Sequence, residues 1–312
     1  MAKSPVFVVH GFLESGKTRF VQETLADDYF SGGERNLVIA CEEGVEEYED
    51  ELLQKTNTTL VVLEDKSEFN EMFLAECQKK YKPTQIIVEY NCMWGLDYLR
   101  EMYMPKGWFV AQVITTVDAT TFDVYLKNMK SLFMEMAKDS DLIIFNRSTD
   151  ETPAATYKRN MRAVNPKAQV VFEKEDGSQL EFEEEMPFDI NADVIEISDV
   201  DYGIWYIDAM DHPEKYDGKT MRFKAMAYTG GRLPKGYFVP GRMAMTCCAE
   251  DMTFLGYICK SKDARNLENR QWVTVRARVE IEYWQDYNGE GPVLYAEEVV
   301  PAEPIKDVVQ FG

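Results

Sequence analysis

The sequence predicts two folded parts, an α/β domain with a mostly parallel sheet and then a smaller all-β domain. Three observations support this. Near the start of the chain, a glycine-rich stretch ending in Gly16-Lys17-Thr18 separates an apolar run from a helical pattern. Apolar runs and helical patterns then alternate up to about Asn146, which is typical of a parallel sheet covered on both faces. From about Tyr216, short alternating runs separated by Gly and Asn indicate paired antiparallel strands.

Residues 11–18 read Gly-Phe-Leu-Glu-Ser-Gly-Lys-Thr, a complete G-x-x-x-x-G-K-[ST] phosphate loop. It follows an expected strand at 6–9 and precedes an expected helix at 19–25, the context that this motif requires. Backbone N–H groups of the loop would surround phosphate oxygens, and the start of the helix adds a positive dipole. We expect Lys17 to reach the β- and γ-phosphates and the Thr18 hydroxyl to bind Mg²⁺. The nucleotide-binding residues expected here are Gly11, Glu14, Ser15, Gly16, Lys17, Thr18 and Arg19.

Glu14 is unusual inside a phosphate loop, because a carboxylate beside phosphates repels them. We therefore expect it to point outward into solvent, with contact to a cation as the alternative.

The other elements of the α/β domain follow in order. Short continuous apolar runs predict strands at 36–40, 59–63, 85–89, 110–117 and 141–146. The segments between them predict helices at about 46–55, 67–81, 95–103 and 121–137. A phosphate-loop domain needs an acid at the end of a neighbouring strand to hold the Mg²⁺ shell, and Glu89 is in that position. The base is expected to lie after a later strand, near Asn146, Arg147 and Asp150.

With these pieces in order, residues 4–172 resemble the CobW/HypB/UreG family of metal-trafficking GTPases, most closely its CobW-like branch. The matching stretches are 8–18, Glu42-Glu43-Gly44, Val88-Glu89, 117–122 and 141–146. The resemblance implies a nucleoside triphosphatase that uses GTP or ATP with Mg²⁺. Lys17 and Glu89 would be its catalytic residues, and Thr18 with Glu89 or Glu43 would hold the metal.

The sequence also departs from the family pattern. The family's Cys-x-Cys-Cys metal motif is expected between about Glu51 and Glu64, where this chain has no cysteine. Its Glu-x-x-Gly becomes Glu89-Tyr90-Asn91-Cys92, with Gly95 as a possible substitute for the glycine. In place of Asn-Lys-x-Asp, the stretch from Asn146 to Asp150 carries its acid one residue late. Guanine is favoured over adenine, and both remain open.

Residues 173–212 are interpreted as an acidic connecting segment that packs partly, between a nucleotide-binding domain at 1–172 and a β-rich domain at 213–312. The alternating strands of this last part suit a small barrel of the OB type. The region from about Tyr216 to Pro304 resembles the C-terminal domain of a two-component permease family of the YcgQ type. It shares a Tyr-Asp-Gly-Lys stretch at 216–219 and a Cys-Cys-Ala-Glu-Asp stretch at 247–251.

Cys247 and Cys248, with Cys259 downstream, allow two interpretations. They could hold Zn²⁺, or they could be buried structural thiols. Adjacent side chains on a strand point to opposite faces, which favours the second interpretation. Cys92 lies just past Glu89 and would be close to the γ-phosphate.

The formal net charge of −21 argues against nucleic acid as a partner, because nucleic-acid binding needs basic patches. No secretory leader and no apolar stretch of about 18 residues is visible. We therefore expect a cytoplasmic protein without membrane insertion and with reduced cysteines. The expected partners are a nucleotide and a metalloprotein client or a permease-type protein. A rival hypothesis is a nucleotide-binding scaffold with negligible hydrolysis.

Overall fold

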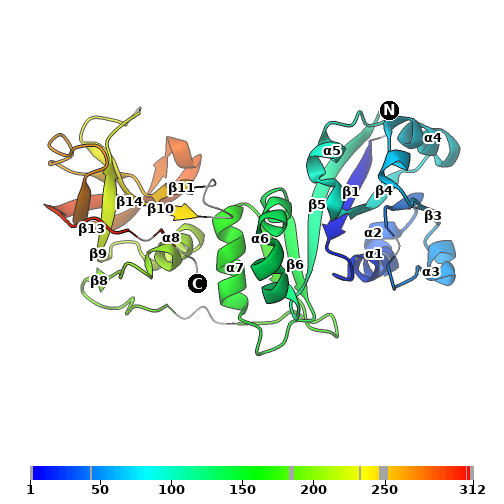
Figure 1. The fold of residues 1–312 in the computed structure, drawn as a ribbon, viewed down its shortest axis with the longest axis horizontal. Coiled ribbons are helices and arrows are strands. Elements are labelled where there is room, and N and C mark those ends of the chain that lie inside the picture. The colour runs from blue at the N-terminus through cyan, green and yellow to red at the C-terminus, as the bar shows by residue number, and fades with distance from the viewer. Residues whose placement is uncertain are drawn as a thin grey trace. The chain divides into compact units, whose positions relative to one another are not determined.

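The computed structural model describes residues 3–42, 44–182, 186–231, 233–245, 252–306 and 308–309. The chain divides into two compact units (Figure 1). The first unit comprises Met1–Ala154 and Val164–Phe182. The second comprises Ala155–Ala163 and Glu183–Gly312.

The first unit is built on a seven-stranded sheet with the order β3-β2-β4-β1-β5-β6-β7. All of its strand pairs are parallel. The strands are β1 (Ser4–Gly11), β2 (Asn36–Ala40), β3 (Thr58–Val62), β4 (Gln85–Asn91), β5 (Trp108–Asp118), β6 (Leu142–Asn146) and β7 (Gln169–Phe172). The helices of this unit are α1 (Lys17–Ala26), α2 (Asp28–Ser31), α3 (Asp50–Lys55), α4 (Glu71–Tyr81), α5 (Leu96–Arg100) and α6 (Phe122–Lys138). Helix α7 (Ala154–Val164) lies between β6 and β7 in the chain, and nearly all of it belongs to the second unit.

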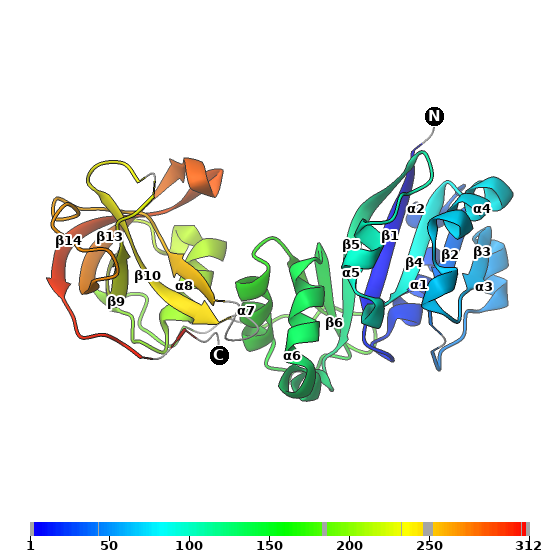
Figure 2. The ribbon, with the colours of Figure 1, turned by 45° about the horizontal axis from the view of Figure 1, so that its top comes forward.

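Helices cover both faces of this sheet (Figure 2). Val8 and Val88 belong to a core shared with α4 and α5. Val9 and Ile87, their neighbours on the same two strands, belong to a second core shared with α1 and α3. This alternation follows from the period of two along a strand. It explains why the buried strands read as continuous apolar runs, and it confirms the predicted α/β class.

The parallel register brings several polar residues to one edge of the sheet. Gly11 at the end of β1 pairs with Asn91 at the end of β4. Asp118 at the end of β5 pairs with Asn146 at the end of β6. Ligands of open α/β sheets bind at the carboxyl ends of the strands, so this edge is where a site is expected.

The second unit contains a mixed sheet with the order β11-β10-β12-β14-β13-β9-β8 and an additional pairing between β10 and β9. Its elements are β8 (Ile195–Glu196), α8 (Tyr202–Asp211), β9 (Thr220–Tyr228), β10 (Tyr237–Met245), β11 (Met252–Gly256), β12 (Cys259–Lys260), β13 (Trp272–Trp284) and β14 (Gly289–Pro301). The extra pairing closes β9, β13, β14, β12 and β10 into a ring. The expected antiparallel pairing is found between β9 and β13 and between β13 and β14. The sheet as a whole is mixed, because the short strands β12 and β8 pair in parallel with β14 and β9. Assignment of the ring to the OB type stays a prediction.

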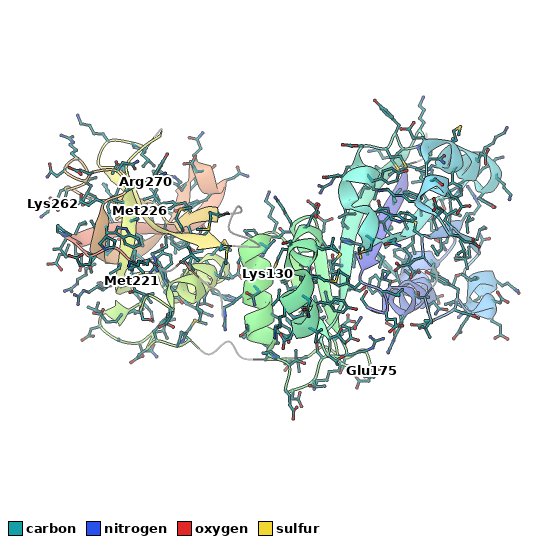
Figure 3. All side chains as sticks on the ribbon, viewed as in Figure 1. Lys130, Glu175, Met221, Met226, Lys262 and Arg270 are labelled. Carbon is teal, nitrogen blue, oxygen red and sulfur yellow. The ribbon has the colours of Figure 1, made fainter. Side chains whose placement is uncertain are left out.

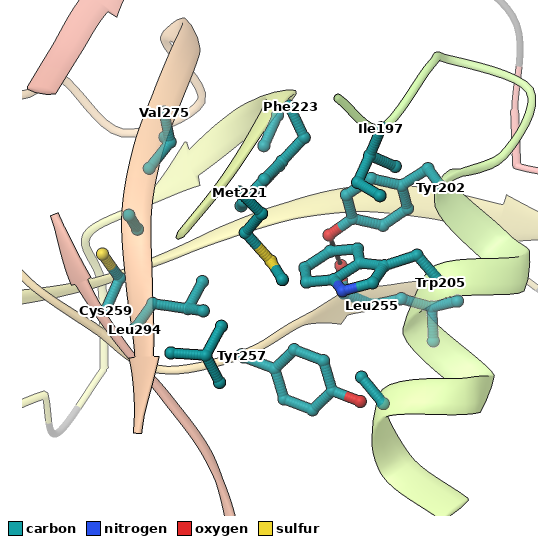
Figure 4. Close-up of a cluster of buried hydrophobic side chains, with 14 of the residues drawn as sticks. Ile197, Tyr202, Trp205, Met221, Phe223, Leu255, Tyr257, Cys259, Val275 and Leu294 are labelled. Atoms are coloured by element: carbon teal, nitrogen blue, oxygen red, sulfur yellow. Dashed lines mark hydrogen bonds between the residues drawn. The ribbon is translucent and has the colours of Figure 1, made fainter. Parts of the chain in front are cut away.

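The core of the second unit includes part of the acidic segment. Trp205 and Tyr202 of α8 point toward Met221 and Tyr257 in the interior of the β structure (Figure 4). Ile195 of β8 is also fully buried. The apolar residues of the segment therefore pack into the same core as the strands, while its acids lie between them along the chain.

No helix among the described residues is long and apolar enough to span a lipid bilayer.

Candidate nucleotide-binding site

The phosphate loop connects β1 to α1 through a tight turn. Gly16 lies at the N-cap of α1 with φ 87°, a left-handed conformation that favours glycine. A Cβ atom at this position would lie 2.6 Å from Asn146 Nδ2, so a larger residue would also collide with the end of β6. The Ser15 hydroxyl lies 2.8 Å from Thr116 Oγ1 of β5. These contacts hold the loop against the sheet edge.

Lys17 is buried and its ammonium group turns back over the loop. It donates hydrogen bonds to Gly11 O at 3.1 Å and Phe12 O at 2.8 Å. It also forms an ion pair with Glu42, which follows β2. The charge of Lys17 is thus neutralised within the protein by a carboxylate at the site where phosphate charge is expected.

Thr18 and Glu89 are in direct contact. Thr18 Oγ1 donates to Glu89 Oε1 at 2.7 Å, and Tyr48 Oη donates to Glu89 Oε2 at 2.5 Å. Burial raises the pKa of Glu89, and the hydrogen bonds from Tyr48 and Thr18 partly oppose that shift because they favour the ionised form. Both carboxylate oxygens of Glu89 are therefore held in place by a hydrogen bond.

A cavity of about 310 Å³ lies above these groups. Its lining residues are Leu13, Glu14, Gly16, Lys17, Thr18, Glu42, Gly44, Val45, Glu46, Glu89 and Arg147. The hydroxyl of Thr18 and the carboxylate of Glu89 are hard oxygen ligands of the kind that Mg²⁺ prefers. These residues fit a Mg²⁺–nucleotide complex. Glu43, the other acid proposed for the metal, lies outside the described residues.

Asn146 and Arg147 lie beside the loop at the end of β6. Asn146 Nδ2 donates to Ser15 O at 2.7 Å. Arg147 has φ 52°, and its Nη1 donates to Glu14 O at 3.1 Å and to Asp118 Oδ2 at 2.5 Å. Burial alone would raise the pKa of Asp118, but hydrogen bonds from Thr120 and Arg147 outweigh it and lower that pKa. Both residues therefore connect the end of β6 to the phosphate loop.

The remaining expected residues are placed differently. Arg19 pairs with Glu23 at 2.9 Å and with Glu175 at 3.1 Å. Glu175 lies in the loop that follows β7 (Figure 3). Glu14 is exposed and has φ 61°. Asp150 is exposed and pairs with Lys174 at 2.9 Å. The described residues that line the cavities around the phosphate loop do not include Asp150.

The described cysteines are Cys41, Cys77, Cys92 and Cys259, and all four are buried free thiols. Burial raises the pKa of Cys92 to about 11, so this thiol is protonated at neutral pH. Among the described residues, no cluster of three or more His, Cys, Asp or Glu side chains is arranged to hold a metal ion. Cys247 and Cys248 lie outside them, so zinc binding there stays a prediction.

Sequence comparisons assign both halves of the chain. Residues 5–172, more than half of the chain, match the CobW/HypB/UreG nucleotide-binding domain. The chain belongs to the CobW/HypB/UreG family. Residues 172–309 match the DUF1980 C-terminal domain. The family assignment from the sequence motifs is thereby confirmed. No curated protein shows a significant match.

Several solved structures resemble part of this CobW/HypB/UreG chain. A Zn(II)-bound YjiA GTPase from E. coli is 18% identical over 55% of this chain and 57% of its own, with a TM-score of 0.43. A Zn(II)-bound triple mutant of YjiA GTPase is 17% identical over 56% of this chain and 59% of its own, with a TM-score of 0.44. The hydrogenase maturation factor HypB from Archaeoglobus fulgidus is 15% identical over 56% of this chain and 84% of its own, with a TM-score of 0.42. This chain thus spans less than two thirds of the YjiA chains.

Two residues of the site were not singled out from the sequence, Glu42 and Tyr48. Glu42 lies in the segment 42–44 that carries the family resemblance, but the metal role was assigned to its neighbour Glu43. Tyr48 lies where a helix was expected from about residue 46, whereas α3 begins at Asp50. Its position in an extended segment before α3 allows its hydroxyl to reach Glu89.

Proposed function

We propose that this CobW/HypB/UreG chain binds GTP with Mg²⁺, hydrolyses it, and couples the nucleotide state to a partner or a metal ion. The Thr18–Glu89 hydrogen bond of 2.7 Å beside the buried Lys17 carries this proposal. A hydroxyl, a carboxylate and an ammonium group converge there on one cavity. This is the set of groups that phosphoryl transfer requires at the β- and γ-phosphates.

In the proposed reaction, water attacks the γ-phosphorus and the bond to the oxygen that bridges the β- and γ-phosphates breaks. The products are GDP and inorganic phosphate, and one proton is released to solvent. Lys17 and the N–H groups of the loop stabilise the charge that develops on the β- and γ-phosphate oxygens. Thr18 and Glu89 hold the Mg²⁺ shell. The bound Mg²⁺ supplies charge neutralisation between the two phosphates.

The direct test compares wild type with Lys17→Ala and with Lys79→Ala, a matched control on the exposed side of α4. Calorimetric titration with a non-hydrolysable GTP analogue and Mg²⁺ should show binding for wild type and Lys79→Ala. Binding to Lys17→Ala should fall at least about 100-fold, since it loses a charge-assisted contact to phosphate. Equal affinity of Lys17→Ala and wild type would refute the site.

A second candidate is a nucleotide-binding regulator with negligible hydrolysis. It is favoured by Cys92, which occupies the position of the family's Glu-x-x-Gly glycine. Cys92 begins a short 3₁₀ turn (Cys92–Trp94) that is followed by Gly95 at φ 74°. Single-turnover measurement of phosphate release distinguishes the two candidates. Release of one phosphate per bound GTP supports the hydrolase, whereas retained GTP supports the regulator.

The coupling to a metal or client is the finer part of the proposal. It is supported by membership in the CobW/HypB/UreG family. Native mass spectrometry of the purified protein with and without GTP and Mg²⁺ would report the bound nucleotide, the metal count and the assembly in one measurement.

A further inference from the structure

A second cavity lies beside the phosphate loop, between the loop, the end of β5 and the start of α6. Its volume is about 270 Å³, close to that of the phosphate cavity. The two cavities meet at Glu14 and Arg147, but Lys17 lines only the first and Phe12 only the second. The loop therefore borders two different cavities, and the second has room for a small ligand with one or two rings.

Aromatic rings form the apolar wall of this second cavity. Phe12 of the loop stacks on Tyr125 of α6, with 4.3 Å between the ring centroids and 11° between the ring planes. Phe133 lies 6.3 Å from Phe12 and 5.0 Å from Phe122, again measured between ring centroids. All four rings line the cavity. Such a wall favours a planar ligand, which can stack on one ring and meet the edge of another.

Helix α6 is kinked where it borders the cavity. Met129 departs from helical geometry, with φ −134° and ψ 33°. The side-chain amide of its neighbour Asn128 donates to Val124 O at 2.7 Å, a carbonyl that the backbone ladder of the helix would otherwise use. On a straight helix, Tyr125 and Phe133 would point about 80° apart. The kink therefore allows both rings to line the same cavity.

Packing alone does not explain this space. Contact between the loop and α6 accounts for the stacking of Phe12 on Tyr125. Protein interiors are close-packed, however, and voids larger than a water molecule are few. Tyr125 is half-buried, and among the described residues its hydroxyl has no hydrogen-bond partner. The cavity thus offers both an open volume and an unused polar group.

The polar wall of the cavity carries more negative than positive charge. Asp118 pairs with Arg147 through Oδ2, and its Oδ1 accepts from Thr120 N at 2.8 Å. Glu14 lines the same cavity, and within the described part of the chain it has no ion-pair partner. Two carboxylates and one guanidinium group leave a net negative charge on this wall. A cation is therefore attracted to the cavity and an anion is repelled.

We propose that this second cavity binds a planar aromatic ligand that carries a positive charge, of the class of the aromatic amines. The ring lies against Tyr125 and Phe133, and the ammonium group faces Asp118 and Glu14. This ligand class combines the flat apolar surface that the rings favour with the charge that the carboxylates favour.

Phe12 connects the proposed site to the phosphate loop. Its carbonyl oxygen accepts from Lys17 Nζ at 2.8 Å and from Ser15 N at 3.1 Å. A ligand that packs on the ring of Phe12 therefore contacts the loop without filling the phosphate cavity. The site does not depend on the proposed hydrolysis of GTP, so the two proposals can fail separately.

Three probes with the same indole ring and the same two-carbon chain test the chemistry. Tryptamine ends in an ammonium group, tryptophol in a hydroxyl and indolepropionate in a carboxylate. Ligand-observed NMR titrations measure their affinities for the full chain without nucleotide. We expect tryptamine to bind with a Kd of about 1 mM or below, given the limited binding energy that each atom of a small ligand contributes. Indolepropionate should bind at least about 10-fold more weakly, with tryptophol between the two.

Three variants test the location. Tyr125→Ala removes a stacking surface and should weaken all three probes at least about 10-fold. Tyr103→Ala is the matched control, because this tyrosine is 81% exposed and does not line the cavity; it should bind like wild type. Asp118→Asn removes one carboxylate and should lower the ratio of tryptamine to indolepropionate affinity at least about threefold. A misfolded variant would lose all three probes and could not shift this ratio selectively, and circular dichroism verifies the fold of Tyr125→Ala.

Dependence on Tyr125 decides the site, because a chain with a net charge of −21 attracts amines weakly over its whole surface. Equal tryptamine affinity in Tyr125→Ala and Tyr103→Ala would overturn the proposal. Equal binding of tryptamine and indolepropionate by wild type would overturn the assignment of charge. Tryptamine should still bind when a non-hydrolysable GTP analogue and Mg²⁺ are saturating. Its displacement by the analogue would show that the nucleotide fills this cavity, which overturns a separate site and leaves GTP binding standing. A chain that binds tryptamine through Tyr125 but binds no triphosphate would refute only the proposed function.

Discussion

Glu42 and Lys17 form a buried ion pair inside the phosphate cavity. The side chain of Lys17 is 3% exposed and that of Glu42 is 13% exposed. The carboxylate of Glu42 neutralises the charge of Lys17, as the phosphate oxygens of a bound triphosphate would. We therefore expect that nucleotide binding breaks this pair before Lys17 reaches the phosphates, and that the pair lowers the affinity for nucleotide.

Glu42→Gln should bind GTP about 10-fold more tightly than wild type, because the competing negative charge is removed. Binding of GMP should change little, since Lys17 is expected to reach the β- and γ-phosphates. The nucleotide-free variant should be less stable to urea by about 3 kcal/mol, because Lys17 keeps a buried charge without its partner. Calorimetry and denaturant titration measure the two effects.

The matched control for this prediction is Glu47→Gln, which removes an exposed acid from the same segment. It should change neither the affinity nor the stability measurably. A weaker affinity of Glu42→Gln for GTP would contradict the prediction and would show that Glu42 contributes to binding, for example through the metal shell.

Tyr48 should affect the Mg²⁺ concentration that GTP binding requires, because its hydroxyl donates a hydrogen bond to Glu89. Tyr48→Phe removes the 2.5 Å hydrogen bond to Glu89 Oε2, which raises the pKa of Glu89 further. The Mg²⁺ concentration for half-maximal GTP binding should rise about threefold to 10-fold, and the rise should be larger at pH 6 than at pH 8 because more Glu89 is protonated. Glu89→Gln should raise it about 10- to 100-fold at both pH values. A Mg²⁺ titration of Tyr48→Phe that matches wild type at both pH values would exclude this role for Tyr48.

Buried strands of the first unit were predictable because local sequence and tertiary burial agree there. β2 occupies Asn36–Ala40, as expected from an apolar run between polar residues. The edge of the sheet was less predictable. No strand was expected at Gln169–Phe172, yet β7 forms the edge of the sheet beside β6. A short strand of four residues after a helix carries little periodic signal.

Helix α8 was missed for a different reason. Its sequence Tyr-Gly-Ile-Trp-Tyr-Ile-Asp-Ala-Met-Asp has apolar residues around most of the helix, so it shows no amphipathic stripe. It also lies in the acidic stretch that was interpreted as a connecting segment that packs partly. Contacts such as Lys17–Glu42 could not be predicted either, because they depend on how the end of β2 meets the loop after β1. The phosphate loop was predicted from a motif, whereas the side chains that contact Lys17 and Glu89 are brought there by the tertiary structure.

Trp205 should be a main determinant of the stability of the second unit. Its ring is 1% exposed and lies 4.9 Å from Phe223, 5.3 Å from Tyr202 and 5.7 Å from Tyr257, measured between ring centroids. Trp205→Ala should lower the free energy of unfolding by about 3–5 kcal/mol, because it leaves a large cavity. Urea unfolding followed by far-UV circular dichroism measures this. Val200→Ala, at a side chain 80% exposed, is the control and should cost less than about 0.5 kcal/mol. An equal loss in both variants would show that α8 does not anchor this core.

His10 should make the stability of the first unit depend on pH. Burial, together with the charge of Lys17, lowers the pKa of His10 to about 3 from an ordinary value of 6.5. Between these values the unfolded chain binds a proton that the folded chain rejects, so stability falls as the pH falls through this window. The expected loss between pH 7 and pH 5 is about 2 kcal/mol. The raised pKa of Glu89 acts in the opposite direction over part of this range, so the difference between wild type and His10→Gln isolates the histidine. Urea unfolding at several pH values should give a shallower acid loss for His10→Gln, and parallel curves for the two proteins would contradict the prediction.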